Sequence, residues 1–132
     1  MAVARPKHLV LILAREFASN LATATMITDE RGYLVYFNEA AEEVFGQSHS
    51  EVGEIPFDDW TSRFEPRSVE TDEPLPKEQR PTGVALYERR ASHQCVRITS
   101  LDGLPRENAV TAFPLFAHHD ELVGTVTIFW RQ

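Results

Sequence analysis

The sequence predicts an α+β domain in which a five-stranded antiparallel sheet carries short helices over one face, with a further helix at the N-terminus. Two observations lead to this prediction. Apolar residues recur with helical spacing near the N-terminus, and the last third of the chain alternates apolar and polar residues between turn signals, as strands do. With 132 residues, the chain has room for one such domain. We expect residues 1–21 to form the N-terminal helix and residues 22–132 the domain.

Composition excludes several classes of function. The chain carries 13 basic and 20 acidic residues, a net charge of −7, which argues against a nucleic-acid partner and against an anionic membrane surface. Cys95 is the only cysteine, so no intrachain disulfide or cysteine metal cluster can form, and a reducing compartment is expected. The apolar run 9–14 is too short for a secretory signal. These features together predict a cytoplasmic protein.

The N-terminal helix is expected over residues 7–21. Val10, Leu13 and Phe17 follow the 3.6-residue period, and further apolar residues widen the stripe until the helix is apolar on most sides. Such a helix requires burial on more than one side. It therefore packs either on its own domain or against a second subunit, and the sequence leaves both open.

A hairpin and a capped helix follow. Residues 23–28 and 33–37 read as strands, and 29–32 as the turn between them, with Gly32 available for positive φ. Asn38 stands at the N-cap of a helix predicted over 39–45, because its side-chain oxygen can accept an unpaired backbone N–H.

The second half of the chain divides into an irregular and a regular part. Residues 47–81 are acidic and rich in proline, which predicts short helical turns, and 82–89 predicts one more helix. Strands are then predicted over 94–100, 107–116 and 122–130.

The order and spacing of these elements resemble those of the PAS (Per-Arnt-Sim) domain family, over roughly residues 20–130. The run from Met26 to Ala41 resembles the opening of such a domain, and the proline-rich segment resembles the middle of bacterial sensor PAS domains. The positions that carry the resemblance are Asp29, Gly32, Asn38, Ala40, Gly46, Asp102, Gly103, Pro114, Leu115 and Gly124.

The resemblance implies a signal-transduction domain that senses a small ligand, redox state or light. It implies a pocket between sheet and helices, a homodimer, and a signalling partner protein. The residues lining such a pocket suggest a small apolar or amphipathic ligand. By position, the pocket is expected to include Met26, Val35, Phe37, Ala41, Phe45, Phe57, Trp60, Val96, Ile98, Asn108, Val110, Val126 and Ile128.

Both faces of the last two strands carry apolar bulk, so neither face can be left in water. An apolar face not covered by the short helices marks an interface. The sequence therefore predicts that the N-terminal helix or a second copy covers it. The expected dimer interface consists of Leu9, Leu13, Phe17, Phe113, Leu115 and Phe129.

Cofactor and metal sites are disfavoured. The expected 82–88 helix lacks the histidine that haem-binding relatives carry, leaving His93 as the nearest candidate ligand, and the flavin-binding Asn-Cys-Arg motif is absent. His118 and His119 are expected in a solvated turn rather than a metal site. Cys95 on its strand would need a lowered pKa to act as a redox thiol.

Two alternatives to a ligand sensor remain. One is a ligand-free dimerisation module with a filled core. The other is a small α+β enzyme of the isomerase type, which would need a buried carboxylate as general base. The expected pocket contains no carboxylate, so we expect no enzymatic activity.

Overall fold

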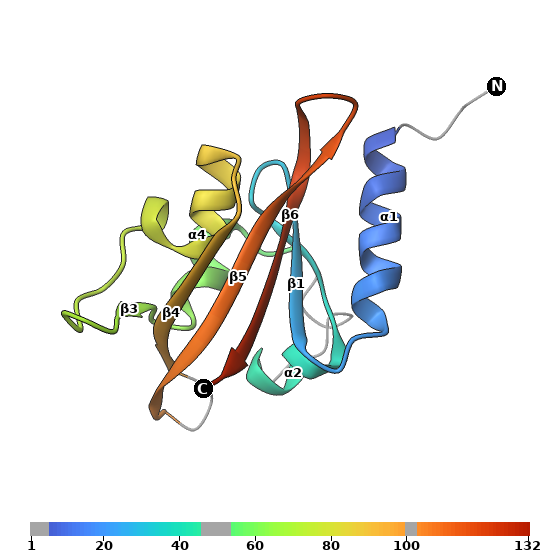
Figure 1. Cartoon of the computed structure of the whole chain (residues 1–132). Coiled ribbons are helices and arrows are strands. Elements are labelled where there is room, and N and C mark those ends of the chain that lie inside the picture. The colour runs from blue at the N-terminus through green and yellow to red at the C-terminus, as the bar shows by residue number, and fades with distance from the viewer. Residues whose placement is uncertain (1–5, 46–53, 100–102) are drawn as a thin grey trace.

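The computed structural model describes residues 6–45, 54–99 and 103–132, except for the side chains of residues 6–8 and 44–45. Within these residues, one antiparallel sheet of six strands runs in the order β2-β1-β6-β5-β4-β3 (Figure 1). The strands are β1 (Ala24–Asp29), β2 (Leu34–Phe37), β3 (Arg67–Ser68), β4 (Ser92–Thr99), β5 (Pro105–Ala117) and β6 (Glu121–Arg131).

The α+β class is confirmed, but the expected number of five strands is wrong. The additional strand, β3, has two residues and pairs with β4 at one edge of the sheet. A strand this short shows no alternation in the sequence, and it lies in the proline-rich segment from which helical turns were expected.

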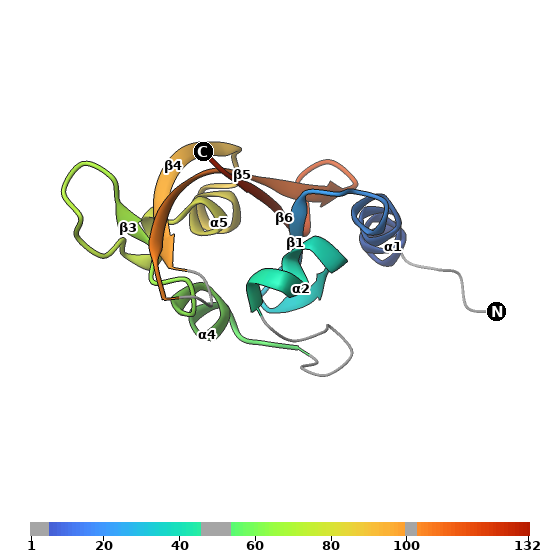
Figure 2. The same cartoon turned by 90° about the horizontal axis from the view of Figure 1, so that it is seen from below.

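The helices lie on both faces of the sheet. They are α1 (Pro6–Ser19), α2 (Glu39–Phe45), α4 (Phe57–Ser62), the 3₁₀ turn η1 (Lys77–Gln79), and α5 (Pro81–Gly83), which continues as the π-helical turn η2 (Val84–Glu88). Seen from below, α4 and α5 lie within the curve of β4 and β5, whereas α1 lies beside β1 and β6 (Figure 2). We call the face toward α4 and α5 the inner face, and the face toward α1 the outer face.

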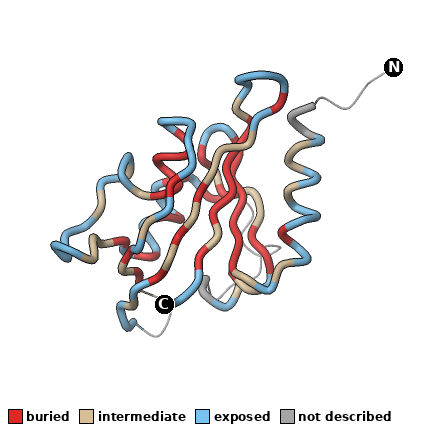
Figure 3. Tube along the Cα trace, in the orientation of Figure 1, coloured by how far each residue is buried: buried red, intermediate tan, exposed pale blue. Residues whose placement is uncertain are grey.

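The inner face carries the larger hydrophobic core, and the majority of its buried residues belong to strands (Figure 3). Its members are Ala24, Met26, Leu34, Phe37, Ala41, Ile55, Phe57, Trp60, Phe64, Leu86, Val96, Ile98, Val110 and Phe129. A smaller cluster on the outer face joins α1 to the sheet and consists of Leu11, Ala14, Ala18, Ile27, Val35, Tyr36, Phe113, Leu115, Val126 and Ile128.

Helix α1 packs on its own sheet through one narrow stripe. Leu11, Ala14 and Ala18 face the strands, whereas the side chains of Leu9, Leu13 and Phe17 are 50%, 59% and 62% exposed. Only part of the apolar surface of this helix is therefore buried against its own chain. None of the helices in the described ranges combines the length and apolarity that crossing a membrane requires.

Strand β6 faces the opposite way from the sequence-based expectation. Val110 pairs with Phe129, and Phe113 with Val126. Directly opposed residues of an antiparallel pair share a face, so Phe129 lies on the inner face, whereas Val126 and Ile128 lie on the outer face. The expected pocket positions of Val126 and Ile128, and the expected interface position of Phe129, are wrong. Alternation groups the residues of one strand but does not say which group faces inward when both are apolar.

Val35 is also misplaced by the expectation, for a separate reason. Met26 pairs with Phe37 and Ile27 with Tyr36, but Thr28 pairs with Leu34, so the register shifts by one residue. The shift leaves Val35 as an extra residue in β2, and it packs with the outer cluster beside Tyr36. The expected pocket position of Val35 is therefore wrong.

Asn38 joins the two layers of helices to the sheet. Its Oδ1 accepts the backbone N–H groups of Thr25 at 3.0 Å and Ala41 at 3.1 Å. Its Nδ2 donates to the carbonyl oxygens of Thr23, Ala18 and Leu21 at 2.8, 3.1 and 3.3 Å. The expected N-cap of the helix at 39–45 is confirmed, and the same side chain also holds the end of α1.

Replacing Asn38 by Ala should lower the free energy of unfolding by about 3 kcal/mol or more, because buried N–H and C=O groups lose their partners. Urea unfolding measures this. Asn20→Ala is the matched control, since the Asn20 side chain is exposed and makes one bond, to the Glu16 carbonyl. Its expected effect is below about 1 kcal/mol, and equal effects of the two substitutions would contradict the central position of Asn38.

The face assignment of β6 predicts opposite outcomes for two neighbouring substitutions. Phe129→Asp buries an unpaired charge in the inner core and should cost more than about 4 kcal/mol of stability, enough to prevent folding of a small domain. Trp130→Asp changes an exposed side chain and should change stability by less than about 1 kcal/mol. Circular dichroism and thermal unfolding distinguish them, and the reverse ranking would overturn the assignment.

Candidate functional site

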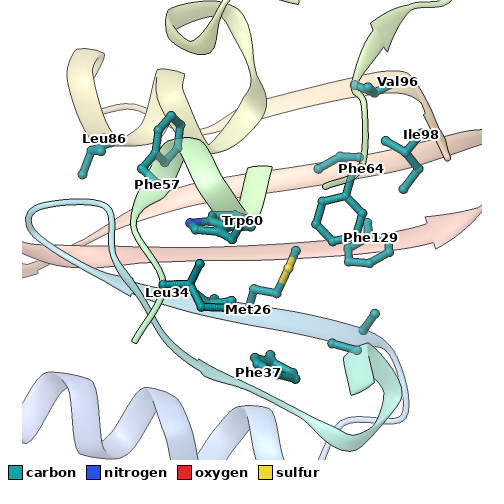
Figure 4. Close-up of a cluster of buried hydrophobic side chains, with 14 residues drawn as sticks. Met26, Leu34, Phe37, Phe57, Trp60, Phe64, Leu86, Val96, Ile98 and Phe129 are labelled. Atoms are coloured by element: carbon teal, nitrogen blue, oxygen red, sulfur yellow. The ribbon is translucent and has the colours of Figure 1, made fainter. Parts of the chain in front are cut away.

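A small cavity lies between α4, α5 and the inner face of the sheet. Its volume is about 50 Å³, and its wall is almost entirely apolar. The lining residues are Met26, Trp60, Thr61, Phe64, Pro66, Arg80, Pro81, Thr82, Val96, Ile98, Val110, Thr127 and Phe129. Figure 4 shows Met26 extending between Trp60 and the rings of Phe64 and Phe129.

The helix side of this core is a chain of aromatic rings. Successive ring centroids from Tyr87 through Phe57, Trp60 and Phe64 to Phe129 are 6.1, 6.0, 6.4 and 5.7 Å apart, all edge to face. Edge-to-face pairs at this spacing are favourable beyond the area that they bury. These aromatic rings therefore form a continuous row from the exposed Tyr87 in η2, past α4, to Phe129 in β6.

A glycine turn supports the tryptophan. Trp60 Nε1 donates to the carbonyl oxygen of Gly32 at 3.1 Å, so the β1–β2 turn satisfies the polar atom of a buried ring. Gly32 has φ +87°, and a Cβ there would lie 2.8 Å from the Leu86 side chain. The positive φ favours glycine at this position, and a Cβ would also crowd the Leu86 side chain. The turn from Asp29 to Gly32 thus holds the Trp60 side chain of α4 in place.

Polar groups gather at one side of the cavity. The hydroxyls of Thr82 and Thr127 bond to each other across the gap between α5 and β6. Arg80, which is half-buried, donates from Nη1 to Thr61 Oγ1 at 2.7 Å and from Nε to the Leu75 carbonyl oxygen at 3.0 Å. Three buried hydroxyls, of Thr61, Thr82 and Thr127, and one guanidinium therefore lie at this side, and each of the hydroxyls is hydrogen-bonded within the protein.

Of the residues expected in the pocket, Met26, Trp60, Val96, Ile98 and Val110 line the cavity. Others lie in the same inner core without lining it, namely Phe37, Ala41 and Phe57. Asn108 is buried and lines a separate surface groove beside α2. The side chain of Phe45 lies outside the described residues.

Sequence reasoning missed the cavity residues Thr61, Phe64, Pro66, Arg80, Pro81, Thr82, Thr127 and Phe129. Six of these eight lie between residues 61 and 82, where no regular pattern assigns side chains to a face. The available signal was composition, since Phe64 is too apolar for a solvated linker. Thr127 was missed with the face of β6.

The cavity volume limits what this conformation can hold. An apolar cavity of roughly 150 Å³ accommodates benzene, whereas a single water needs about 10–15 Å³. A cavity of about 50 Å³ thus holds a molecule of a few non-hydrogen atoms. A haem or flavin ring would require α4 and α5 to move away from the sheet.

The expected interface residues separate into three groups. Leu9, Leu13 and Phe17 are exposed on the outer side of α1. Phe113 and Leu115 are half-buried and pack in the outer cluster with α1 of the same chain. Phe129 lies in the inner core, as described above. A second copy could therefore contact α1 directly, but not Phe129.

Where the structure describes them, the histidine and cysteine side chains lie away from the cavity. Cys95 is exposed, with Sγ 2.9 Å from Gln132 Oε1, and His93 Nδ1 lies 3.0 Å from Thr111 Oγ1. His118 and His119 occupy the β5–β6 turn, both with φ 44°. In the described part of the chain, no three His, Cys, Asp or Glu side chains come close enough to hold a metal ion.

Comparison with known proteins agrees with the fold. The family model described as "PAS domain" matches residues 22–131. Among solved structures, the chain is similar to the PAS domain of Bordetella pertussis BvgS, at 15% identity and a TM-score of 0.64, covering 92% of this chain and 84% of that one.

Two further structures are similar. The PAS domain of nitrogen regulation protein NR(II) from Vibrio parahaemolyticus gives 20% identity and a TM-score of 0.59, covering 91% of this chain and 98% of that one. The Rhodobacter sphaeroides LOV protein gives 12% identity and a TM-score of 0.66, covering 93% and 67% respectively. At these identities the likeness shows a common fold. Among curated proteins, none matches the sequence.

The aromatic chain makes a prediction about the cavity wall. Phe64→Ala should cost about 3–5 kcal/mol, because it removes a buried ring that contacts two others and enlarges the cavity. Tyr87→Ala removes the exposed end of the same chain and should cost less than about 1 kcal/mol. Chemical denaturation measures both. A loss below about 1 kcal/mol for Phe64→Ala would mean that the ring already borders solvent.

Proposed function

Since the family model covers residues 22–131, the chain belongs to the PAS domain family, and we propose that it is a signal-sensing domain that binds a small ligand in the inner cavity and acts through a dimer formed by α1. The PAS domains of bacterial sensor proteins to which it is similar support a sensing role. The ligand, the dimer and an output partner protein are parts of the proposal.

One observation carries it: a single layer of strands separates the cavity from α1. Phe129 and Met26 line the cavity, whereas Ile128 and Ile27, their immediate neighbours in β6 and β1, belong to the outer cluster under α1. Interiors this tightly packed transmit small displacements. A ligand that favours one arrangement of Phe129 would therefore shift the position of α1, in proportion to its differential affinity for the two arrangements.

The exposed stripe on α1 supports dimerisation. Leu9, Leu13 and Phe17 lie four residues apart, so they form one row along the helix. Large apolar side chains aligned on one face of a surface helix mark an interaction site. Two such rows from two copies would bury each other, and this arrangement would place α1 between the partner subunit and the sheet.

We propose binding rather than catalysis. The lining of the cavity contains apolar side chains, hydroxyls and one guanidinium, and none of the described lining residues is a carboxylate or an imidazole. A general base within reach of a substrate proton is the first requirement of the isomerase alternative.

A second candidate function is a dimerisation module without a ligand, and the cavity volume of about 50 Å³ favours it. Native mass spectrometry of the purified chain distinguishes the two. A dimer that retains a small molecule, or takes one up from a screen, supports sensing. A dimer that remains free of ligand throughout supports the module, and a monomer at micromolar concentration contradicts both.

Leu13→Asp should convert the dimer to a monomer while the fold is retained, because the carboxylate would lie in an apolar contact between copies. Sedimentation velocity measures the change, with circular dichroism as the test of folding. Leu104→Asp is the control, since Leu104 is equally apolar and 55% exposed but lies away from α1. An unchanged sedimentation coefficient for Leu13→Asp would exclude α1 as the dimer interface.

A further inference from the structure

We propose that the cavity recognises a short monocarboxylate, whose carboxylate is bound by Arg80 and whose apolar part occupies the cavity; this inference rests on the ligand-binding role proposed above. The argument depends on the hydrogen bonds of Arg80, on its position between two concave surfaces, and on the volume behind it.

Arg80 is a half-buried cation with only neutral partners. Its two hydrogen bonds go to the Thr61 hydroxyl and the Leu75 backbone carbonyl. Within the described residues, the carboxylates that form ion pairs do so with Arg31, Arg90 and Arg97, and none lies within 4 Å of Arg80. The chain has seven more acidic than basic residues. Acidic residues are therefore plentiful, yet none of those described forms an ion pair with Arg80.

The remaining donors of Arg80 fit a carboxylate. A guanidinium has five N–H groups, of which the bonds to Thr61 and Leu75 use two. Its planar fork matches the two oxygens of a carboxylate, and charge-assisted bonds of this kind are stronger than neutral ones. A neutral ligand of the same shape would not gain this interaction.

Arg80 lies at the boundary between the cavity and the surface. Arg80 and Pro66 line both the cavity and an outer groove, whose other walls are Ser62, Glu65, Arg67 and Pro74. A ligand entering from this groove would place its apolar end among Phe129, Val96 and Met26 and leave its charged end at the guanidinium. Glu65 and Arg67 in the groove carry opposite charges, so the single remaining charge of Arg80 matches one carboxylate.

The volume sets the size of the ligand. Scaling from the roughly 150 Å³ that holds the six carbons of benzene, a cavity of about 50 Å³ holds two or three carbons. Propionate is therefore the probe that fits without opening the domain. Propionamide has the same shape without the charge, and 1-propanol provides an apolar control.

The competing explanation is structural. The bonds of Arg80 to Thr61 and Leu75 join α4 to the segment before η1, and this alone could account for the residue. A purely structural arginine would not give the domain a preference for a charged ligand over its neutral isostere. The preference, and its loss on substitution, is therefore the quantity to measure.

The experiment titrates the full chain with each probe at constant ionic strength and follows backbone amides by ¹H–¹⁵N NMR. Propionate should give saturable shifts at Met26, Val96 and Phe129, with an affinity at least about tenfold higher than that of propionamide or 1-propanol. Arg80→Gln should abolish the preference, and Arg80→Lys should keep part of it because the cation remains. Arg67→Gln, which removes a groove cation that does not line the cavity, should keep it in full.

Each other result has a defined meaning. Equal affinities for propionate and propionamide, or a preference that survives Arg80→Gln, would overturn the carboxylate assignment and leave the sensing role intact. Loss of the preference in Arg67→Gln would place the anion in the outer groove and also overturn it. Absence of saturable cavity shifts with all three probes would overturn both the assignment and ligand binding in this cavity. If Arg80→Gln fails to fold, Arg80→Lys is used instead. A reduced ratio of propionate to propionamide affinity in Arg80→Lys supports the assignment, and an unchanged ratio overturns it.

Discussion

The structure depends on one buried amide. Asn38 is 1% exposed, and its side chain bonds to backbone groups at the end of α1, in β1 and in the first turn of α2. Burying an amide is costly unless its donors and acceptors are all paired, and here the pairing is possible only when α1, β1 and α2 meet at one point. The side chain therefore fixes the helix on the outer face relative to the helix that begins on the inner face. The position of α1, on which the proposed dimer depends, follows from this constraint.

In the centre of the sheet, the same strands contribute side chains to the inner core on one face and to the outer cluster on the other. Gly124 in β6 illustrates how closely the layers approach, because a Cβ there would lie 2.0 Å from the Thr28 carbonyl oxygen and 3.2 Å from the Leu11 side chain. The Leu11 side chain of helix α1 thus packs closely on the backbone of β6 at Gly124, where the strand has no side chain of its own. A displacement of β6 that begins at the cavity would therefore reach α1 through closely packed side chains.

The sequence was informative where local chemistry decides the structure and uninformative where contacts between strands decide it. Asn38 as an N-cap and the turn at Gly32 could be predicted, because each depends on a conformation that few residue types adopt. The face of β6 could not, because Val126 and Phe129 are both large and apolar and only pairing with β5 assigns them. Arg80 could not be found either, since its partners, Thr61 and Leu75, are 19 and 5 residues away in a segment without periodicity.

The way α4 is held explains how the cavity could respond to a ligand. Two side-chain hydrogen bonds connect α4 to the elements around it. Trp60 Nε1 donates to the Gly32 carbonyl oxygen, and Arg80 Nη1 donates to Thr61 Oγ1. The first lies in the rigid turn between β1 and β2, where glycine is favoured. The second uses a side chain that borders both the cavity and the surface groove. A carboxylate at Arg80 would use the N–H donors that the bonds to Thr61 and Leu75 leave available, so both bonds could remain when a ligand binds. Phe64 follows α4, and its carbonyl oxygen accepts the N–H of Thr99 in β4 at 2.8 Å, so its backbone is tied to the sheet while its ring borders the cavity. Because the Phe64 ring packs on Phe129, a ligand that displaces this ring would act on β6, the strand whose opposite face supports α1.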